Sequence, residues 1–453
     1  MAGSINRRAV RWLRGQLPEL VAAGAISSEN AAAIERHYGP VEPRSNFGFV
    51  ILATVGAALV GAGIVLLIAH NWDYLNRATR TVIAFLPLLI ALALAGFVLL
   101  QRNESRPWRE AVAVFDFAAV ATAISLISQT YQIQGSFAEF MRVWLLLCIP
   151  IVYVLRAGVA AAIYVIGTIV WLFAREIAFF VRLPNPMFFW ILFLLAVPYF
   201  LFRFFEDRTS RETSALAIIM TIALTFGMGF TADFAKTDFG GIAFAGLFTA
   251  IYLCGVRFFP RTDERLHTVA LLGGIGIGVT AIVLSFESTW HMARELSWGQ
   301  RALGQNVALA LELLFPIIAI ILGAFEIFRG RRGFSIIAGA FPIVTAVIWW
   351  VANLCPTGSA EHLYKTKCSF AAAALMNCYA LWLGIDILIR GIRSDSIARA
   401  NFGLLLIAAL AISRFFDSEL TFMTRGLGFI VVGAGFLIAN IVMFKRRAAA
   451  VTP

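Results

Sequence analysis

Long apolar runs separated by short polar segments make up most of this chain. A helix needs about 20 apolar residues to cross the hydrocarbon core of a bilayer. On that scale the pattern predicts fourteen membrane spans, near residues 48–69, 81–101, 111–128, 143–155, 157–174, 187–204, 214–232, 240–256, 267–285, 308–328, 333–353, 369–389, 400–413 and 426–444. The two spans that flank Arg156 are short and almost continuous, so a merged or re-entrant pair would give thirteen or twelve.

The basic residues predict how these spans are oriented. With fourteen spans, the segments on the side of the N-terminus hold 25 of the 37 Lys and Arg residues. Cytoplasmic loops carry such an excess in bacterial membrane proteins. We therefore expect a bacterial inner-membrane protein with both termini in the cytoplasm, a membrane domain over residues 46–447 and a cytoplasmic tail over residues 448–453.

Composition supports the membrane class. Of the 453 residues, 60% are hydrophobic and 14% are charged, whereas soluble domains are roughly 45–50% apolar. The net charge of +11 comes from the short segments between apolar runs, where basic residues set topology and do not indicate nucleic-acid binding. The expected fold class is all-α, a polytopic transmembrane helix bundle in contact with the lipid bilayer.

The polar residues 1–45 predict a short cytoplasmic helical hairpin ahead of this bundle. Apolar residues recur at helical spacing from Val10 to Val21, Gly24 suits a helix stop, and Ser27 or Ser28 suits the cap of a second helix. A hairpin of this size buries little core alone. It is expected to pack on the membrane domain, on the lipid surface, or on a second copy or another protein.

Several short motifs resemble a known family. They are GAISSE in the hairpin, AHNWDYL in the first loop, and ISQTYQIQG followed by WLLLCIPIVYVLRA. Over about residues 5–200, and more faintly in the terminal RGLGFIVVGAGFLIANIVMFKRR, the chain resembles the bacterial multi-pass proteins of domain of unknown function 2157. This resemblance implies a helical membrane fold and no established activity, so it assigns no catalytic residue.

Two outer segments, 69–80 and 129–137, are rich in uncharged polar and aromatic residues. One interpretation is that their aromatic rings lie at the membrane interface. The other is that both segments fold inward and line a polar vestibule, because Gln side chains offer donors and acceptors without a charge. The residues expected to line it are Asn71, Trp72, Asp73, Gln129, Tyr131, Gln132 and, from the tenth span, Glu312. Such a lining suits a neutral or zwitterionic small molecule.

Carboxylates inside apolar runs are further candidates, because ionisable residues in membrane spans are costly and usually functional. Asp116 and Glu312 are each expected about five residues into a span, either as carboxyls that reach headgroup water or as groups that bind a proton or a substrate. Asp386 is expected to pair with Arg390 at i+4. No span is expected to carry an ionisable residue at its midpoint, which argues against ion-coupled transport.

Cys355 and Cys368 bracket an outer segment. The oxidising periplasm favours a disulfide between them, and the other interpretations are two free thiols or a metal site with His362. Elsewhere His291 and Glu295 provide only two ligands at i,i+4 spacing, so no metal site and no cofactor is predicted.

The glycine cluster LLGGIGIGVT, with Gly274, Gly276 and Gly278, lacks the strand and polar helix of a nucleotide-binding loop. It predicts close packing between helices instead.

These features favour a transporter or permease-like protein for a neutral or zwitterionic small solute, because so many spans exceed what an anchor needs. The alternative is a non-transporting membrane assembly or sensory protein that acts through its cytoplasmic hairpin and outer loops. An enzyme is not expected, because no HExxH, GxSxG or paired catalytic aspartates occur.

Overall fold

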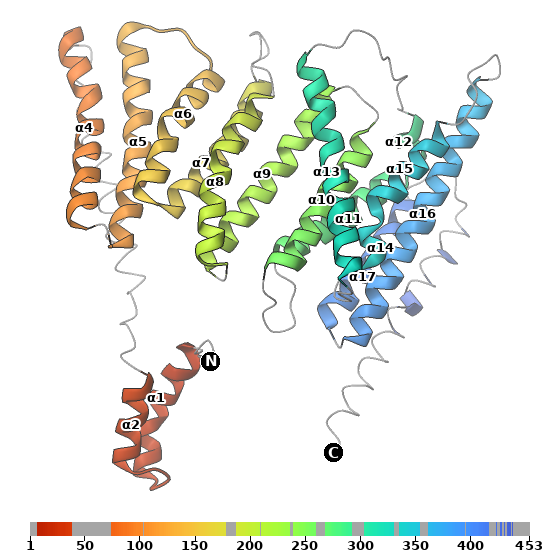
Figure 1. The fold of residues 1–453 in the computed structure, drawn as a ribbon, viewed down its shortest axis with the longest axis horizontal. Helices are drawn as coiled ribbons and strands as arrows, with labels where there is room; N and C mark the ends of the chain where they lie inside the picture. The colour runs from red at the N-terminus through yellow and green to blue at the C-terminus, as the bar shows by residue number, and fades with distance from the viewer. Residues whose placement is uncertain are drawn as a thin grey trace. The chain divides into compact units, whose positions relative to one another are not determined.

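The computed structural model describes residues 7–38, 74–102, 104–177, 187–208, 210–235, 239–259, 268–291, 303–329, 335–353, 361–394 and 396–415, with scattered residues between 423 and 437. Within these ranges the regular elements are helices, and no strand occurs. The chain divides into two compact units, Met1–Arg80 and Thr81–Pro453 (Figure 1). The second is called the membrane unit below. The predicted first span and most of the last lie outside the described residues, so the count of fourteen stays a prediction.

The first unit contains the predicted helical hairpin. Helix α1 (Arg7–Ala22) ends just before Gly24, whose φ of 70° lies in the left-handed region that glycine adopts most easily. Helix α2 (Ser28–Tyr38) begins where the Ser27 hydroxyl accepts a hydrogen bond from the Asn30 N–H at 3.1 Å. The predicted stop and cap are therefore confirmed. The cytoplasmic location and the predicted boundary after residue 45, which lies outside the described residues, stay predictions.

The membrane unit is a series of apolar helices that run up and down (Figure 1). Its first helices are α4 (Arg77–Gln101), α5 (Arg106–Tyr131), α6 (Phe137–Leu155), α7 (Gly158–Ile177), α8 (Phe188–Glu206), α9 (Arg211–Ala235) and α10 (Gly240–Phe258). They are followed by α11 (Thr268–Leu284), α12 (Glu287–His291), α13 (Leu303–Phe328), α14 (Ile336–Gly339), α15 (Phe341–Ala352), α16 (Glu361–Arg393) and α17 (Ile397–Phe415).

Length and composition confirm an all-α polytopic membrane fold. In the described part of the chain, nine helices are long and apolar enough to cross a membrane, and α7, α11 and α15 are shorter apolar helices. The two spans around Arg156 are separate helices, α6 and α7. Arg156 is the C-cap of α6 with a φ of 49°, which reverses the chain within a very short turn.

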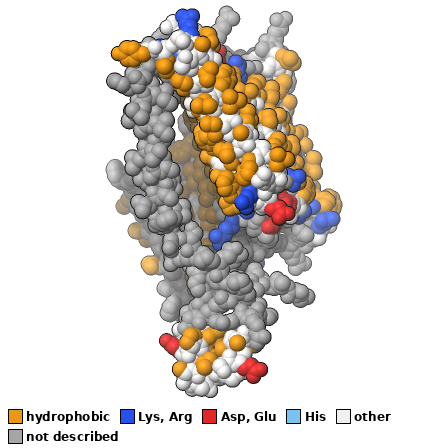
Figure 2. All heavy atoms as spheres, turned by 90° about the vertical axis from the view of Figure 1, so that its left-hand side faces the viewer, with side chains coloured by type: hydrophobic (Ala, Val, Ile, Leu, Met, Phe, Trp, Pro, Cys, Tyr) orange, Lys and Arg blue, Asp and Glu red, His pale blue; other side chains and the backbone are white. Residues whose placement is uncertain are grey.

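The outward faces of these helices are apolar, as lipid contact requires. On α4 the exposed residues include Val82, Leu86 and Leu89, while Ala84 and Ala91 are fully buried one helical stripe away. Figure 2 shows a broad band of hydrophobic side chains with basic side chains at its two ends. This is the pattern of a bundle whose apolar middle faces acyl chains and whose charged ends face headgroups.

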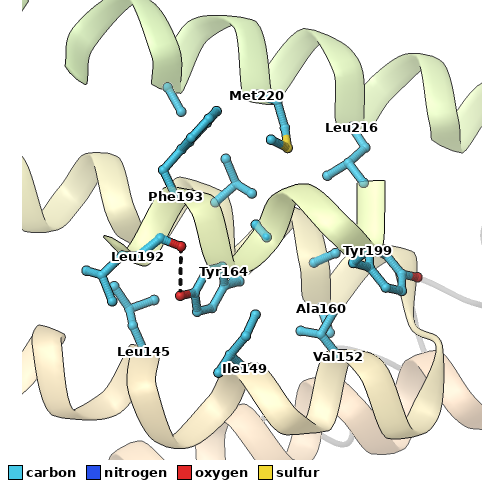
Figure 3. Close-up of a cluster of buried hydrophobic side chains, with 14 of the residues drawn as sticks. Leu145, Ile149, Val152, Ala160, Tyr164, Leu192, Phe193, Tyr199, Leu216 and Met220 are labelled. Atoms are coloured by element: carbon cyan, nitrogen blue, oxygen red, sulfur yellow. Dashed lines mark hydrogen bonds between the residues drawn. The ribbon is translucent and has the colours of Figure 1, made fainter. Parts of the chain in front are cut away.

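Two clusters of buried side chains form the core. The first involves α4 to α10 and the start of α11, and the second involves α10 to α12 and α14 to α17. Helix α10 contributes to both, with Leu247 in the first and Ala245 in the second. Figure 3 shows part of the first cluster, where the Tyr164 hydroxyl donates a hydrogen bond to the Leu192 carbonyl at 3.0 Å. The close packing of α10 on both sides joins the two halves of the unit.

Candidate functional site

The uncharged polar run after residue 128 is the end of helix α5. Gln129, Tyr131 and Gln132 are exposed, and Gln132 is the C-cap in the left-handed region, with a φ of 49°. The Tyr131 hydroxyl forms a hydrogen bond of 3.1 Å with the Thr81 hydroxyl near the start of α4. The ends of two neighbouring helices are thus linked here, on the side where both predicted vestibule segments were placed.

The other predicted vestibule residues lie apart from this end or outside the described ranges. Asn71, Trp72 and Asp73 lie outside the described residues. Glu312 is on α13 and is completely buried, and α13 packs on α9, α10 and α15, whereas α5 packs on α6 and α7. A vestibule shared by all seven residues stays a prediction.

Asp116 is a carboxylate in the middle of α5. Its side chain is 1% exposed, and neither carboxylate oxygen has a hydrogen-bond partner in the part of the chain that the structure describes. Its neighbours on the same helix face, Val112, Ala113 and Val120, belong to the first hydrophobic cluster. Asp116 is therefore surrounded by apolar side chains, and the expectation of a carboxyl that reaches headgroup water is wrong.

Both carboxylates lie on helices that begin before the predicted spans. Helix α5 has 26 residues and begins at Arg106, so Asp116 lies about 15 Å along it, near its middle. Glu312 is the tenth residue of the 26-residue α13. The expected spans began later because charged or polar residues interrupt the apolar run, but those residues continue the helix. The expectation that no membrane span carries an ionisable residue at its midpoint stays a prediction, because helix length alone does not fix where the membrane lies along α5 and α13.

Glu312 lies next to a proline and a close helix contact. Pro316, four residues later, has no N–H to offer to the Glu312 carbonyl. At the same level Gly246 of α10 lies so near that an added Cβ would be 2.5 Å from the Pro316 Cα. One turn from Glu312, the Phe315 ring lies 6.2 Å from the Trp190 ring, and the Trp190 Nε1 donates to the Thr231 hydroxyl at 2.9 Å.

Asp386 has the partner that its spacing predicted. The Arg390 Nε lies 2.8 Å from its Oδ2, and the Ser335 hydroxyl donates to the same oxygen. Ser335 also caps α14 by accepting from the Ala338 N–H. Asp386 therefore holds the short helix α14 against α16, which is a structural role.

A group of charged residues that the sequence analysis missed lies where α5, α7, α8 and α9 meet. We call Arg106, Glu110, Arg203 and Glu212 the charged cluster. Glu212 is paired with both arginines, and Glu110 accepts two hydrogen bonds from the start of α7. The Arg and Glu residues in the first turns of α5 and α9 were a signal for it. Their partners came from helices far apart in sequence, so the pairing could not be found.

The structure describes four of the five cysteines. Cys148, Cys254 and Cys378 are free, and Cys368 is part of a disulfide bond. Its predicted partner Cys355 lies outside the described residues, so that pairing stays a prediction. Among the residues described, no group of three His, Cys, Asp or Glu side chains is arranged to hold a metal ion.

Comparison with known families supports the resemblance seen in the motifs. Residues 18–161 match the family described as Predicted membrane protein (DUF2157). The match includes α2, α4, α5 and α6, and therefore Asp116 and Glu110. No curated protein and no solved structure matches the chain. The resemblance to this family is confirmed over these residues, and the family description includes no activity.

Proposed function

We propose that the membrane unit carries a small neutral or zwitterionic solute across the bilayer and that Glu312 contacts this solute. The observation that carries the proposal is the complete burial of Glu312 inside an apolar helix long enough to cross a membrane. Burying a carboxylate there is costly, and such residues usually face a substrate or ion pathway. The proposal includes no enzymatic step.

Beside the carboxylate, the backbone carbonyl of Glu312 is a second hydrogen-bond acceptor for a solute. Because Pro316 has no N–H, it cannot make the helical hydrogen bond to the Glu312 carbonyl. Prolines also interrupt α4, α6 and α8, but there the residues four positions earlier are Ile83, Leu146 and Leu194. Among these proline-containing membrane helices, α13 alone combines an acidic side chain with this carbonyl position.

This chemistry favours a particular class of solute. A carboxylate and a carbonyl both accept hydrogen bonds. They therefore suit a solute with N–H or O–H donors, such as the ammonium group of a zwitterion or the hydroxyls of a polyol. The contact of α10 with α13 at Gly246 and Pro316 places the position between helices of the bundle, away from lipid. We propose the inner-membrane orientation with both termini cytoplasmic as part of this function.

Solute permeation into proteoliposomes tests the proposal. The full chain is reconstituted, and vesicles are shocked with glycerol, urea or glycine, or with glycine betaine, which has no N–H or O–H donor. Light scattering then reports how fast the vesicles re-swell. We expect faster re-swelling than in empty liposomes for at least one donor solute and no acceleration for glycine betaine.

The variant Glu312→Gln keeps the shape of the side chain and removes the charge. A hydrogen bond to a charged group is worth about 1.5–3 kcal/mol, so we expect a slowing of about tenfold or more. Glu104→Gln, at an exposed position between α4 and α5, is the matched control and should be unchanged. Re-swelling equal to that of empty liposomes for every solute, or equal rates for Glu312→Gln and the native chain, would overturn the proposal.

A second candidate function is membrane assembly or sensing through the hairpin. It is favoured by one observation, namely that Met1–Arg80 forms a compact unit separate from the membrane unit. A separate unit can contact a second copy without altering the bundle.

A further inference from the structure

Asp116 differs from two other shielded carboxylates in the described ranges, Glu326 and Asp386. Glu326 is paired with Arg257, and Asp386 is paired with Arg390. Asp116 is more buried than either, yet both of its oxygens lack a hydrogen-bond partner in the described ranges. It also takes no part in the proposed solute contact at Glu312.

Two polar side chains of the helices packed on α5 donate to backbone carbonyls and not to Asp116. The Trp144 Nε1 of α6 donates to the Phe117 carbonyl at 2.8 Å, and the Tyr164 hydroxyl of α7 donates to the Leu192 carbonyl at 3.0 Å (Figure 3). Cys148 of α6 is within electrostatic range of Asp116. A thiol is only a weak hydrogen-bond donor. None of these groups supplies a strong donor to the carboxylate.

Among the described residues, no basic side chain forms an ion pair with Asp116. On α5 itself the nearest arginine in sequence, Arg109, precedes Asp116 by seven residues, about 10 Å along the axis. On α4 the residues from Thr81 to Gln101 include no titratable side chain. The titratable residues of α6 are Glu139, Arg142, Cys148 and Tyr153, and those of α7 are Tyr164, Arg175 and Glu176. Of these, Cys148 is in electrostatic range of Asp116, and a thiol carries no positive charge.

An ionised carboxylate in this position would be expensive. An unpaired buried charge costs several kcal/mol even after the protein relaxes. A bound proton removes the charge, and it needs no cavity larger than the one that the side chain already fills. Among small ligands, a proton is therefore the one that fits the packed surroundings of Asp116.

We propose that Asp116 holds a proton in the described conformation and releases it in another conformation of the transport cycle, so that solute movement is coupled to proton movement. This inference rests on the proposed transport function. In the step itself, a proton leaves the carboxyl O–H bond for water and returns to a carboxylate oxygen. No redox partner is involved.

Infrared difference spectroscopy tests the proton without any solute. The full chain in lipid nanodiscs is compared with Asp116→Asn from about pH 5 to about pH 9, the range in which a perturbed carboxyl would titrate. We expect the native chain to show a protonated-carboxyl C=O band that the variant lacks and that fades as the pH rises. Glu110→Gln is the matched control on the same helix and should leave this band in place.

Two spectroscopic results would overturn the inference. A band absent at every pH would mean that Asp116 stays ionised. A band unchanged at every pH would mean that its proton is never exchanged. Either result leaves the Glu312 permeation experiment unaffected, so failure of this inference is distinguishable from failure of the proposed function.

The coupling of solute movement to proton movement is measured in proteoliposomes that contain the pH-sensitive dye pyranine. A gradient of the solute that permeates in the Glu312 experiment should change the internal pH with the native chain. With Asp116→Asn we expect the solute to move while the pH change is lost. An equal pH change in both proteins would overturn the coupling. If no solute permeates at all, the transport proposal fails, and the infrared experiment still decides whether Asp116 exchanges a proton.

Discussion

The carboxylate of Glu110 on α5 caps helix α7 at Gly158. Its oxygens accept hydrogen bonds from the backbone N–H groups of Gly158 at 2.7 Å and Val159 at 2.9 Å. These two donors are among the four N–H groups at the start of a helix that lack an intrahelical partner. A negative charge also complements the positive end of the helix dipole. One side chain therefore satisfies the start of α7 and fixes it to α5.

Removing this carboxylate is predicted to destabilise the membrane unit. Glu110→Ala leaves two N–H groups without their charged acceptor, and we expect a loss of about 2–4 kcal/mol, from about 1.5–3 kcal/mol for each such bond less partial replacement by water. Glu110→Gln, which keeps one neutral acceptor, should lose less. Thermal unfolding in detergent, followed by tryptophan fluorescence, measures the effect. Glu206→Ala, an exposed carboxylate on α8, serves as the control, and equal midpoints for both alanine variants would contradict the prediction.

The contact between α10 and α13 is predicted to tolerate no side chain at Gly246. A Cβ there would lie 2.5 Å from the backbone Cα of Pro316, and a backbone atom cannot move aside as a flexible side chain can. We expect Gly246→Ala to cost about 1–3 kcal/mol or more through overpacking.

Gly274→Ala is the matched control, because nothing lies within 4 Å of its added Cβ. Alanine is also the better helix former by about 1 kcal/mol, so this variant should be neutral or stabilising. Thermal midpoints in detergent measure both variants. Similar destabilisation of the two would show that the close contact at Gly246 is unimportant.

Local signals in the sequence predicted local structure well. Gly24 and Ser27 marked the end of α1 and the start of α2, because stops and caps depend on residues within one turn. The glycine cluster on α11 predicted close packing, and Gly276 does lie against the Phe248 ring. Yet Gly274 faces open space, and Gly273, which was not singled out, lies against the backbone of Tyr252. Which glycine faces a neighbour depends on how α11 is rotated, and the sequence does not contain that information.

The candidate site was only partly predictable for a similar reason. Asp116 and Glu312 stood out because they are carboxylates in apolar runs. How far along its helix each one lies could not be judged, because hydropathy alone ended each predicted span at the first charged or polar residues. On α5 those residues are held within the helix by partners such as the start of α7 for Glu110. Such long-range pairs become visible only once the helices are packed.

A disulfide between Cys355 and Cys368 is predicted on the outer side. Cys368 is disulfide-bonded, and closing a loop of roughly a dozen residues stabilises by about 2–3 kcal/mol. Mass spectrometry of an unreduced digest should find the two cysteine peptides joined, and Cys368→Ser should lower the thermal midpoint. Cys378→Ser, at a free cysteine on the same helix, is the control. Two alkylated thiols at Cys355 and Cys368 in protein kept oxidised throughout would contradict the pairing.

Deleting residues 1–45 is predicted to abolish self-association while the membrane unit stays folded. The membrane unit is compact by itself, so the deletion variant should still insert and keep its thermal midpoint. If the hairpin mediates self-association, mass photometry in nanodiscs should show the native chain as an oligomer and the deletion variant as a monomer. Leu17→Asp, at a buried hairpin position, should act like the deletion, whereas Glu19→Ala, at an exposed position, should not. An unchanged mass for the deletion variant would rule out assembly through the hairpin, because no other described unit is separate from the bundle. Transport would then be the function left to test.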